Sequence, residues 1–267
     1  MSDDKATAFG TTYAELYDRY LVPMLFAPYA EFVARRAANL HPDTVLETAA
    51  GTGIATQSLA TMLPGASITA TDLNQPMIDQ AKAKADFRNV TWQQADAMNL
   101  SVADGCFDLV VCQFGVMFFP DKQIAFREAR RVLRPEGNLL FVVWEDWKLM
   151  PTAPLAIAAD TVAGLVGCDP GMLVNPPYHD EPVIRTDLEA AGFRHIEIDR
   201  VVQPARAASA RQAAIATVHG SLIRTVIEST APGRLDDATN GVERAIRGKL
   251  GDGQIVGATR ALVVLAH

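Results

Sequence analysis

The sequence has few cysteines and no excess of basic residues. Its 267 residues include three cysteines, Cys106, Cys112 and Cys168, with no CxxC spacing. A disulfide framework or a thiolate metal site is therefore not expected, and we expect a protein of the reducing cytoplasm. The formal net charge is -7, whereas proteins that bind a phosphate backbone usually carry a basic excess. Nucleic acid is therefore not an expected partner.

Other absences narrow the class further. The N-terminus has no basic segment followed by an apolar run, and no stretch has the apolar length that a membrane span needs. No cluster of residues resembles a metal-ligand set, and no GxSxG motif indicates hydrolysis. With 49% hydrophobic residues, the chain is long enough for one sizeable core and an appended helical segment. The oligomeric state stays open.

Short apolar runs alternate with helical segments between residues 41 and 146. This alternation predicts right-handed βαβ units and a doubly wound, mostly parallel α/β sheet, which two strands near the C-terminus complete to seven. Helices are expected over Ile54–Met62, from Gln75 to Ala85 and over Lys122–Leu133. The expected strands are Thr44–Leu46, Ser67–Thr71, Val90–Gln94, Phe107–Cys112, Asn138–Trp144, Arg194–Val202 and Ala258–Ala266.

The remaining segments suggest helical additions to this core. We expect an N-terminal helical cap over residues 1–40, the α/β core over 41–146 and a Pro- and Gly-rich insertion over 147–182. The core continues over 183–203, a helical lid insertion follows over 204–254, and the final core strand occupies 255–267.

Small residues stand where the first strand meets its helix, in the run Glu47–Gly53 (ETAAGTG). Glycine there lets the backbone approach a ligand closely, and the following helix presents free N–H groups. The GxGxxG dinucleotide fingerprint is incomplete, because Ala49 and Ala55 interrupt it. The loop alone therefore fits either a nucleotide-cofactor site or a tight structural turn.

Acidic residues end the first three strands. Glu47 ends the first, Asp72 the second and Asp96 the third. A single acid at a strand end is usually a cap or a solvated turn residue. Three in succession beside a small-residue loop favour a ligand site, because ligands of open α/β sheets bind at the carboxyl ends of strands. Asp72 stands where an acid can accept both ribose hydroxyls.

These segments together resemble class I SAM-dependent methyltransferases (methyltransferase type 11), where SAM is S-adenosylmethionine, and most of all the ubiquinone/menaquinone-biosynthesis group. The resemblance covers about residues 40 to 145 and implies a Rossmann-like methyltransferase fold that uses SAM. The matching segments are Glu47–Gly53, Asp72–Met77, Asp96–Ala97, Phe107–Gly115 and Arg131–Leu139.

The resemblance implies roles for individual positions. Gly51 and Gly53 would line the methionine and ribose portion of SAM, and Glu47 would orient water or the ammonium group. Asp72 would accept hydrogen bonds from the ribose hydroxyls, and Asp96 from the adenine amino group. The other expected contacts are Ala49 and Thr52 in the loop, Leu73, Met77 and Ala97 around adenine, Gln113 and Phe114 near the methyl donor, and Tyr17 or Tyr20 as a cover over SAM.

One position departs from the resembled pattern, because the family often has glycine where this chain has Ala49. We expect alanine to be acceptable only if its φ stays negative. Its methyl group would narrow the space beside the carboxylate end of SAM.

The acceptor is expected to be a small, largely apolar molecule, methylated on O, N or C. An apolar pocket is expected from Phe114, Met117, Phe118, Phe119, Trp144 and Trp147. A base is needed only if the acceptor must lose a proton early. The candidates are His219 in the lid and His179 in the insertion, with Glu145 and Asp146 after the fifth strand.

Alternatives stay open at this point. Asn175–Tyr178 (NPPY) has the composition of an amino-methyltransferase motif, but it follows the fifth strand, not the fourth, so a Pro-rich loop is favoured. A SAM-binding protein without transferase activity is the second hypothesis. The third is an NAD-dependent oxidoreductase, against which the interrupted fingerprint and the position of Asp96 count.

Overall fold

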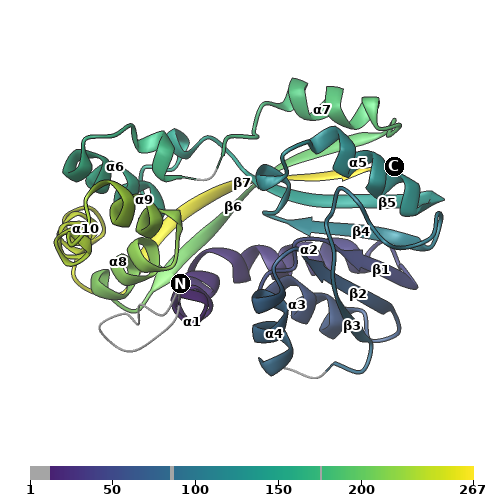
Figure 1. The fold of residues 1–267 in the computed structure, drawn as a ribbon, viewed down its shortest axis with the longest axis horizontal. Coiled ribbons are helices and arrows are strands. Elements are labelled where there is room, and N and C mark those ends of the chain that lie inside the picture. Colours follow the sequence, from purple (N-terminus) through teal and green to yellow (C-terminus); the bar gives the residue numbers. More distant parts are fainter. Residues whose placement is uncertain (1–12, 85–86, 175) are drawn as a thin grey trace. The chain divides into compact units, whose positions relative to one another are not determined.

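The chain divides into two compact units in the computed structural model, which describes residues 13–84, 87–174 and 176–267 (Figure 1). The α/β unit comprises residues 29–145, 177–201 and 260–267. The helical unit comprises residues 1–28, 146–176 and 202–259. Two of the strands, β6 and β7, contribute residues to both units.

A seven-stranded sheet forms the centre of the fold, in the order β3-β2-β1-β4-β5-β7-β6. Strands β1 to β5 pair in parallel, and β7 pairs antiparallel to β5. The predicted doubly wound, mostly parallel sheet is therefore confirmed. The strands are β1 (Thr44–Glu47), β2 (Ser67–Asp72), β3 (Val90–Gln94), β4 (Phe107–Gln113), β5 (Leu133–Trp144), β6 (Ile196–Ala207) and β7 (Ile255–Ala266).

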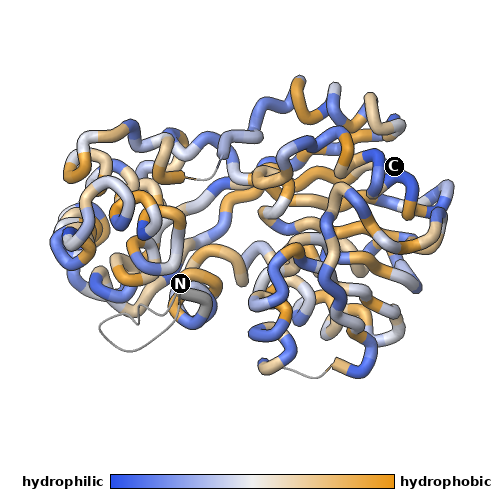
Figure 2. The backbone as a smooth tube through the Cα atoms, in the orientation of Figure 1, coloured by the Kyte–Doolittle hydropathy of each residue, from blue (hydrophilic) through white to orange (hydrophobic). Residues whose placement is uncertain are grey.

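Helices cover this sheet on both faces. Nearly every residue of β1, β4 and the second half of β5 is buried, as expected of parallel strands covered on both sides, and the central strands are largely apolar (Figure 2). The helices of the α/β unit are α2 (Ala27–Ala38), α3 (Ile54–Met62), α4 (Gln75–Lys84), η2 (Val116–Phe118), α5 (Lys122–Val132) and α7 (Glu181–Ala190).

The strand boundaries differ from prediction mainly at β6 and β5. β6 ends at Ala207 instead of Val202, so the predicted start of the helical lid at residue 204 is wrong. β5 begins at Leu133 instead of Asn138. Phe107 pairs with Leu133, but Leu109 pairs with Asn138, so the register shifts between them. The four residues from Arg134 to Gly137 thus stand opposite Asp108 alone, and Arg134 forms an ion pair with Asp108. The sequence of this bulge, Arg-Pro-Glu-Gly, is typical of a turn, so the strand was predicted to begin only after it.

The helical unit is built around α8 (Ala210–His219), which contacts η1 (Tyr17–Phe26), α6 (Pro154–Val166) and α10 (Leu235–Leu250). Small side chains such as Ala213, Ala214 and Ala216 are fully buried, which permits close helix packing. Its other helices are α1 (Tyr13–Leu16), η3 (Trp147–Leu149), η4 (Pro170–Leu173) and α9 (Leu222–Thr230). In the described part of the chain, no helix has the length and apolarity needed to cross a membrane.

The expected cap over residues 1–40 is divided between the units after Pro28. Most of α2 belongs to the α/β unit, because one face of this helix is buried there. Tyr29 is fully buried and its hydroxyl donates to the carbonyl of Val201 on β6 at 3.4 Å. Arg36 forms ion pairs with Glu197 and Asp199 on the same strand.

Candidate functional site

Asp72 connects the tips of two neighbouring strands. Its Oδ2 accepts a hydrogen bond from the N–H of Gly51, and its Oδ1 from the N–H of Asn74, both at 2.8 Å. The side chain is 7% exposed. Because a carboxylate oxygen has two lone pairs, each oxygen can accept one more hydrogen bond. Asp72 therefore fixes the glycine loop and keeps capacity for two ligand hydroxyls.

Gly51 and Gly53 serve different purposes in this loop. Both have positive φ, 57° and 82°, which favours glycine. A Cβ on Gly53 would lie 2.7 Å from the ring of Trp92, whereas one on Gly51 would meet no atom within 4 Å. Gly53 is therefore glycine because the Trp92 ring lies against it, whereas Gly51 borders open space that a ligand can occupy. Thr52 between them is buried.

Glu47 lies beneath the loop with 1% of its surface exposed. The Thr56 hydroxyl donates to its Oε2 at 2.6 Å, and the Thr71 hydroxyl donates to its backbone carbonyl at 2.9 Å. Burial, with a contribution from the charge of Asp72, raises the pKa of Glu47 to about 8 despite the hydrogen bond from Thr56. Its carboxyl group is therefore mostly protonated at neutral pH.

The backbone of Ala49 differs from the conformation expected from the sequence. Its φ is 52°, in the left-handed region, so the expected negative φ is wrong. The loop holds this conformation because Ala50, the next residue, donates its N–H to the Thr71 carbonyl at 2.9 Å, and Gly51 donates to Asp72. The Ala49 methyl group faces Gly115, which leaves room for it.

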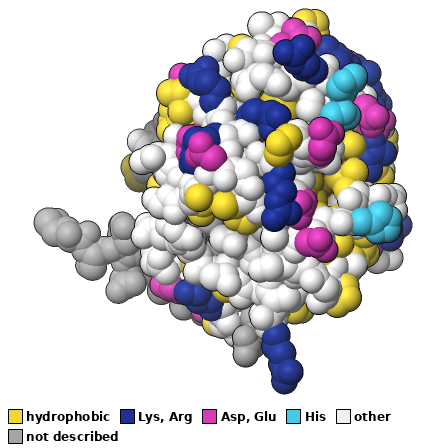
Figure 3. All heavy atoms as spheres, turned by 90° about the vertical axis from the view of Figure 1, so that its right-hand side faces the viewer, with side chains coloured by type: hydrophobic (Ala, Val, Ile, Leu, Met, Phe, Trp, Pro, Cys, Tyr) yellow, Lys and Arg dark blue, Asp and Glu magenta, His cyan; other side chains and the backbone are white. Residues whose placement is uncertain are grey.

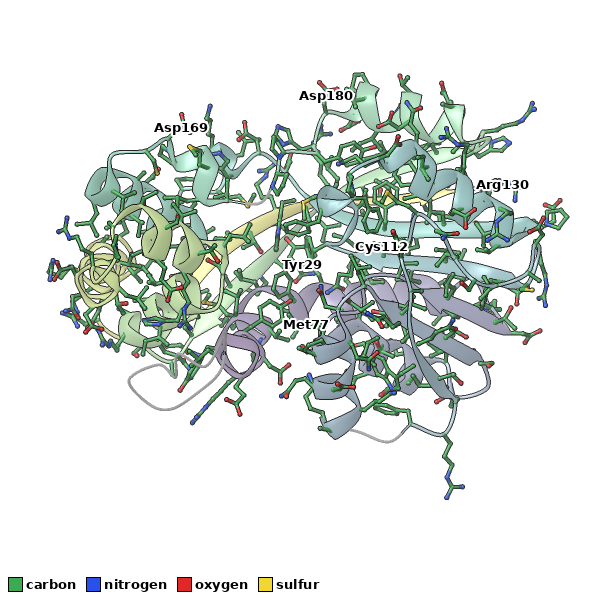
Figure 4. All side chains as sticks on the ribbon, viewed as in Figure 1. Tyr29, Met77, Cys112, Arg130, Asp169 and Asp180 are labelled. Carbon is green, nitrogen blue, oxygen red and sulfur yellow. The ribbon has the colours of Figure 1, made fainter. Side chains whose placement is uncertain are left out.

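The expected adenine-binding residues lie at the ends of β2 and β3. Leu73 is 61% exposed and Met77 on α4, labelled in Figure 4, is half-buried. Asp96 is half-buried, and its Oδ1 accepts from the N–H of Met98 at 2.8 Å. Ala97 lines a small, largely apolar pocket together with Thr48, Leu100, Cys112, Val116 and Phe119.

Comparison with known proteins agrees with this geometry. Residues 46–141 match a family model described as a methyltransferase domain. An uncharacterized protein of Mycobacterium tuberculosis is 39% identical over 111 residues, which are 40% of each chain. The ubiquinone/menaquinone biosynthesis C-methyltransferase UbiE of Caulobacter vibrioides is 29% identical over 185 residues, 60% of this chain and 72% of that protein. The chain thus spans about 40% of the length of the first curated relatives it matches.

Solved structures extend the agreement to the fold. The YcgJ protein from Bacillus subtilis aligns with a TM-score of 0.57 and 17% identity, over 88% of this chain and 97% of that one. The chain belongs to the class I SAM-dependent methyltransferases. The predicted family and the predicted fold are confirmed.

Gln113 is the last residue of β4, and Phe114 follows it. Gln113 is half-buried, and Phe114 is buried with a φ of 58°. The Phe114 ring stacks on Trp144 with centroids 3.8 Å apart, and Tyr29 meets both rings edge-on. Tyr29 was not among the predicted site residues, because nothing in the sequence shows that α2 packs beside the ends of β4 and β5.

The residues expected to form an apolar pocket differ in their burial and in the elements that carry them. Met117 is buried and Phe118 is 48% exposed, because the segment after β4 forms the short helix η2 instead of continuing the strand. Phe119 is half-buried and Trp147 lies on η3 of the helical unit. Phe114 and Trp144 are the members of the set that contact each other through their rings.

Glu145 and Asp146 have structural partners. The two oxygens of Glu145 accept from Arg200 and Arg260 at 3.0 and 2.7 Å. Burial opposes ionisation of Glu145, but the hydrogen bonds and charges of these arginines hold its pKa below the usual value. Asp146 accepts from the N–H of Lys148 at 3.0 Å. Neither arrangement suits a general base.

His219 lies at the end of α8 in the helical unit. Its Nε2 is 2.9 Å from the Thr239 hydroxyl, which itself lies 2.8 Å from the Leu235 carbonyl. Thr239 must donate to that carbonyl, so it accepts from His219 Nε2–H, and Nδ1 carries the lone pair. Among the described residues Nδ1 has no hydrogen-bond partner and is buried. Burial, with the nearby charge of Arg224, lowers the pKa of His219.

The remaining candidates lie as follows. His179 is half-buried in the α/β unit, just before α7. Tyr17 and Tyr20 lie on η1 in the helical unit, where Tyr17 packs against Phe26. Asn175 of the NPPY segment lies outside the described residues. Across residues 13–84, 87–174 and 176–267, no group of three or more His, Cys, Asp or Glu could hold a metal ion.

Proposed function

We propose that this protein transfers a methyl group from SAM to a small, largely apolar acceptor. The main supporting observation is the hydrogen bond from the Gly51 N–H to Asp72, which joins the loop after β1 to the end of β2. The strand order reverses on the other side of β1, between β1 and β4. The hydrogen bond places a carboxylate with free lone pairs beside a glycine that borders open space. This arrangement suits a nucleoside. The two ribose hydroxyls can donate hydrogen bonds to the carboxylate, while the group attached to the ribose lies along the glycine loop.

The residues present fit SAM as a cofactor. Asp72 would hold the ribose hydroxyls, and Gly51, Thr52 and Gly53 would lie along the methionine portion. Leu73 and Met77 would pack on adenine, whose amino group would donate to Asp96. SAM, when bound, supplies an activated methyl group on its sulfonium. The protein's task is then to hold the acceptor in line and exclude water, which positioning and a preorganised environment achieve.

Features around the site support a small apolar acceptor. Phe114, directly after β4, and Trp144, the last residue of β5, stack their rings at the ends of these strands. UbiE, a relative, is named for ubiquinone/menaquinone biosynthesis. On the face drawn in Figure 3, basic and acidic side chains are interspersed, and the net charge is -7. Both features suit a small molecule better than nucleic acid. His219, with its buried Nδ1 lone pair, is the candidate base, with His179 second, and residues 204–254 are the candidate lid.

Calorimetry with SAM and with NAD tests the cofactor assignment. We expect SAM to bind and NAD to give no heat of binding. Incubation with methyl-labelled SAM and a panel of quinols, phenols and amines then tests transfer. Binding of NAD in place of SAM would refute the assignment. Binding of SAM without label transfer to any class of acceptor would favour a SAM-binding protein that does not transfer methyl groups.

A further inference from the structure

Gly115 is glycine for reasons of space and not of backbone conformation. Its φ of -93° and ψ of -38° are open to any residue. A Cβ added there would lie closer to the Cβ of Ala49 than real carbon contacts allow, and 2.8 Å from the Sγ of Cys112. Cys112 is 2% exposed, so its side chain has little room to move. Gly115 therefore leaves a space that the Ala49 methyl group fills.

Ala49 shows the reverse relation. Its φ of 52° lies where glycine is usual, so alanine is strained there. At each of the two positions, the residue is not the type that the backbone conformation alone favours. Alanine stands in the loop after β1, where the backbone favours glycine, and glycine stands in the turn after β4, where the backbone accepts any residue.

A buried thiol reinforces the contact between these segments. Cys112 is buried, and Thr48, Gly115 and Val116 lie near enough to its thiol to moderate its pKa. It lies on β4, as Figure 4 shows. Burial raises its pKa to about 11, so the thiol stays neutral. The loop after β1 thus meets the turn after β4 where Ala49 faces Gly115, and Cys112 at the end of β4 closes the same space from the other side.

Phe114 makes this connection relevant to the cofactor site. It directly precedes Gly115, has a left-handed φ of 58° and stacks on Trp144. Strained backbone of this kind persists only where the surroundings hold it. Any displacement of Gly115 therefore moves Phe114, and any displacement of Ala49 moves the loop that contains Gly51.

We infer that Gly115 is a positioning residue for the cofactor site, because the space it leaves for the Ala49 methyl group holds the Phe114 turn against the glycine loop. The inference rests on the proposed function. Positions 49 and 115 therefore act as a pair. A side chain at position 115 fits beside the loop only when position 49 is glycine.

A double-mutant cycle tests the pair. SAM affinity is measured by calorimetry, and the melting temperature by circular dichroism, for Gly115→Ala, Ala49→Gly and the double variant Ala49→Gly/Gly115→Ala. Gly115→Ala should weaken SAM binding at least tenfold, and the affinity of Ala49→Gly supplies the fourth corner of the cycle. The double variant should bind at least threefold more tightly than Gly115→Ala. Recovery should be incomplete, because the Cys112 Sγ still opposes a Cβ at position 115.

Gly65→Ala is the matched control, since a Cβ at Gly65 would meet no atom within 4 Å; it should leave SAM affinity unchanged. If Gly115→Ala binds SAM like the wild type, or the double variant binds no better than Gly115→Ala, the inference is wrong. Should Gly115→Ala fail to fold, its rescue by Ala49→Gly in the melting curve becomes the readout, and absence of rescue overturns the inference. Wild-type protein that binds no SAM would refute the proposed function as well, whereas wild-type binding with failed coupling refutes the inference alone.

Discussion

The two units hold their candidate functional groups in different ways. In the α/β unit, Gly51, Asp72 and Phe114 lie at strand ends that the sheet register brings together, and backbone hydrogen bonds fix them. In the helical unit, His219 lies on α8 and depends on Thr239 of α10. Because neighbouring parallel strands end at the same edge of a sheet, short motifs at their ends lie close together and can form one site. A helix bundle offers no such rule, since the direction of each side chain depends on packing.

Asp72→Ala is expected to have the largest effect and to test the α/β side of this comparison. It removes the acceptor for two ribose hydroxyls and for the Gly51 N–H. Hydrogen bonds to charged groups contribute about 1.5–3 kcal/mol each. SAM affinity should therefore fall more than 100-fold, measured by calorimetry.

Asp72→Asn is the companion variant, because its single carbonyl oxygen cannot replace both carboxylate oxygens. It should lose at least tenfold in affinity while keeping a cooperative melting transition. SAM binding unchanged by both substitutions would contradict the ribose assignment and the placement of the cofactor at these strand tips.

His219→Ala tests the helical side. If His219 Nδ1 takes a proton from the acceptor, turnover should fall about 10²-fold, with SAM affinity unchanged. Because burial lowers its pKa from 6.5, the base form prevails at lower pH than usual, so turnover should rise with pH in a limb below 6.5. The measurement is initial rate against pH with an acceptor from the panel.

Thr239→Val serves as the control for His219, since it removes the partner of Nε2 but keeps the imidazole. It should lower turnover less than His219→Ala does. Equal turnover in the wild type and in His219→Ala would show that His219 only contributes to packing and is not the base.

Glu47 provides a pH test of the α/β unit. Its pKa in the folded protein is about 8, above the usual 4.5. The neutral carboxyl therefore contributes stability that is complete below pH 4.5 and is lost as the pH rises through 8. Melting temperatures of the wild type should fall relative to those of Glu47→Gln between pH 5 and pH 9. Parallel curves for the two proteins would show that Glu47 is not buried as a neutral acid.

The same carboxyl should link SAM binding to protons. A cationic cofactor nearby favours ionised Glu47, so SAM affinity should increase by several-fold from pH 6 to pH 8. Glu47→Gln should remove this dependence. Calorimetry in two buffers of different ionisation enthalpy would detect the released proton, and a buffer-independent heat would contradict the linkage.

The sequence predicted the sheet well because its central strands β1 and β4 are short apolar runs bounded by turns. It also predicted the acids at strand ends, since their positions follow from where each run stops. It did not predict the backbone of Ala49, because a left-handed alanine depends on Gly115, which lies 66 residues away in the chain. Tyr29 was missed for the same reason, since its place beside Phe114 depends on how α2 packs.

Asp96→Asn should have the smallest effect and is the sharpest test among the strand-tip acids. Asp96 Oδ1 already accepts from Met98 N–H in a local turn, and asparagine keeps that bond because its Oδ1 accepts in the same way. Its amide N–H₂ cannot accept from the adenine amino group, however, so a role in adenine binding predicts a loss of about 1 kcal/mol, or roughly fivefold in SAM affinity. If Asp96 only shapes the turn, calorimetry will give the wild-type affinity, and adenine must then be held by Leu73, Met77 and Ala97 without an acid.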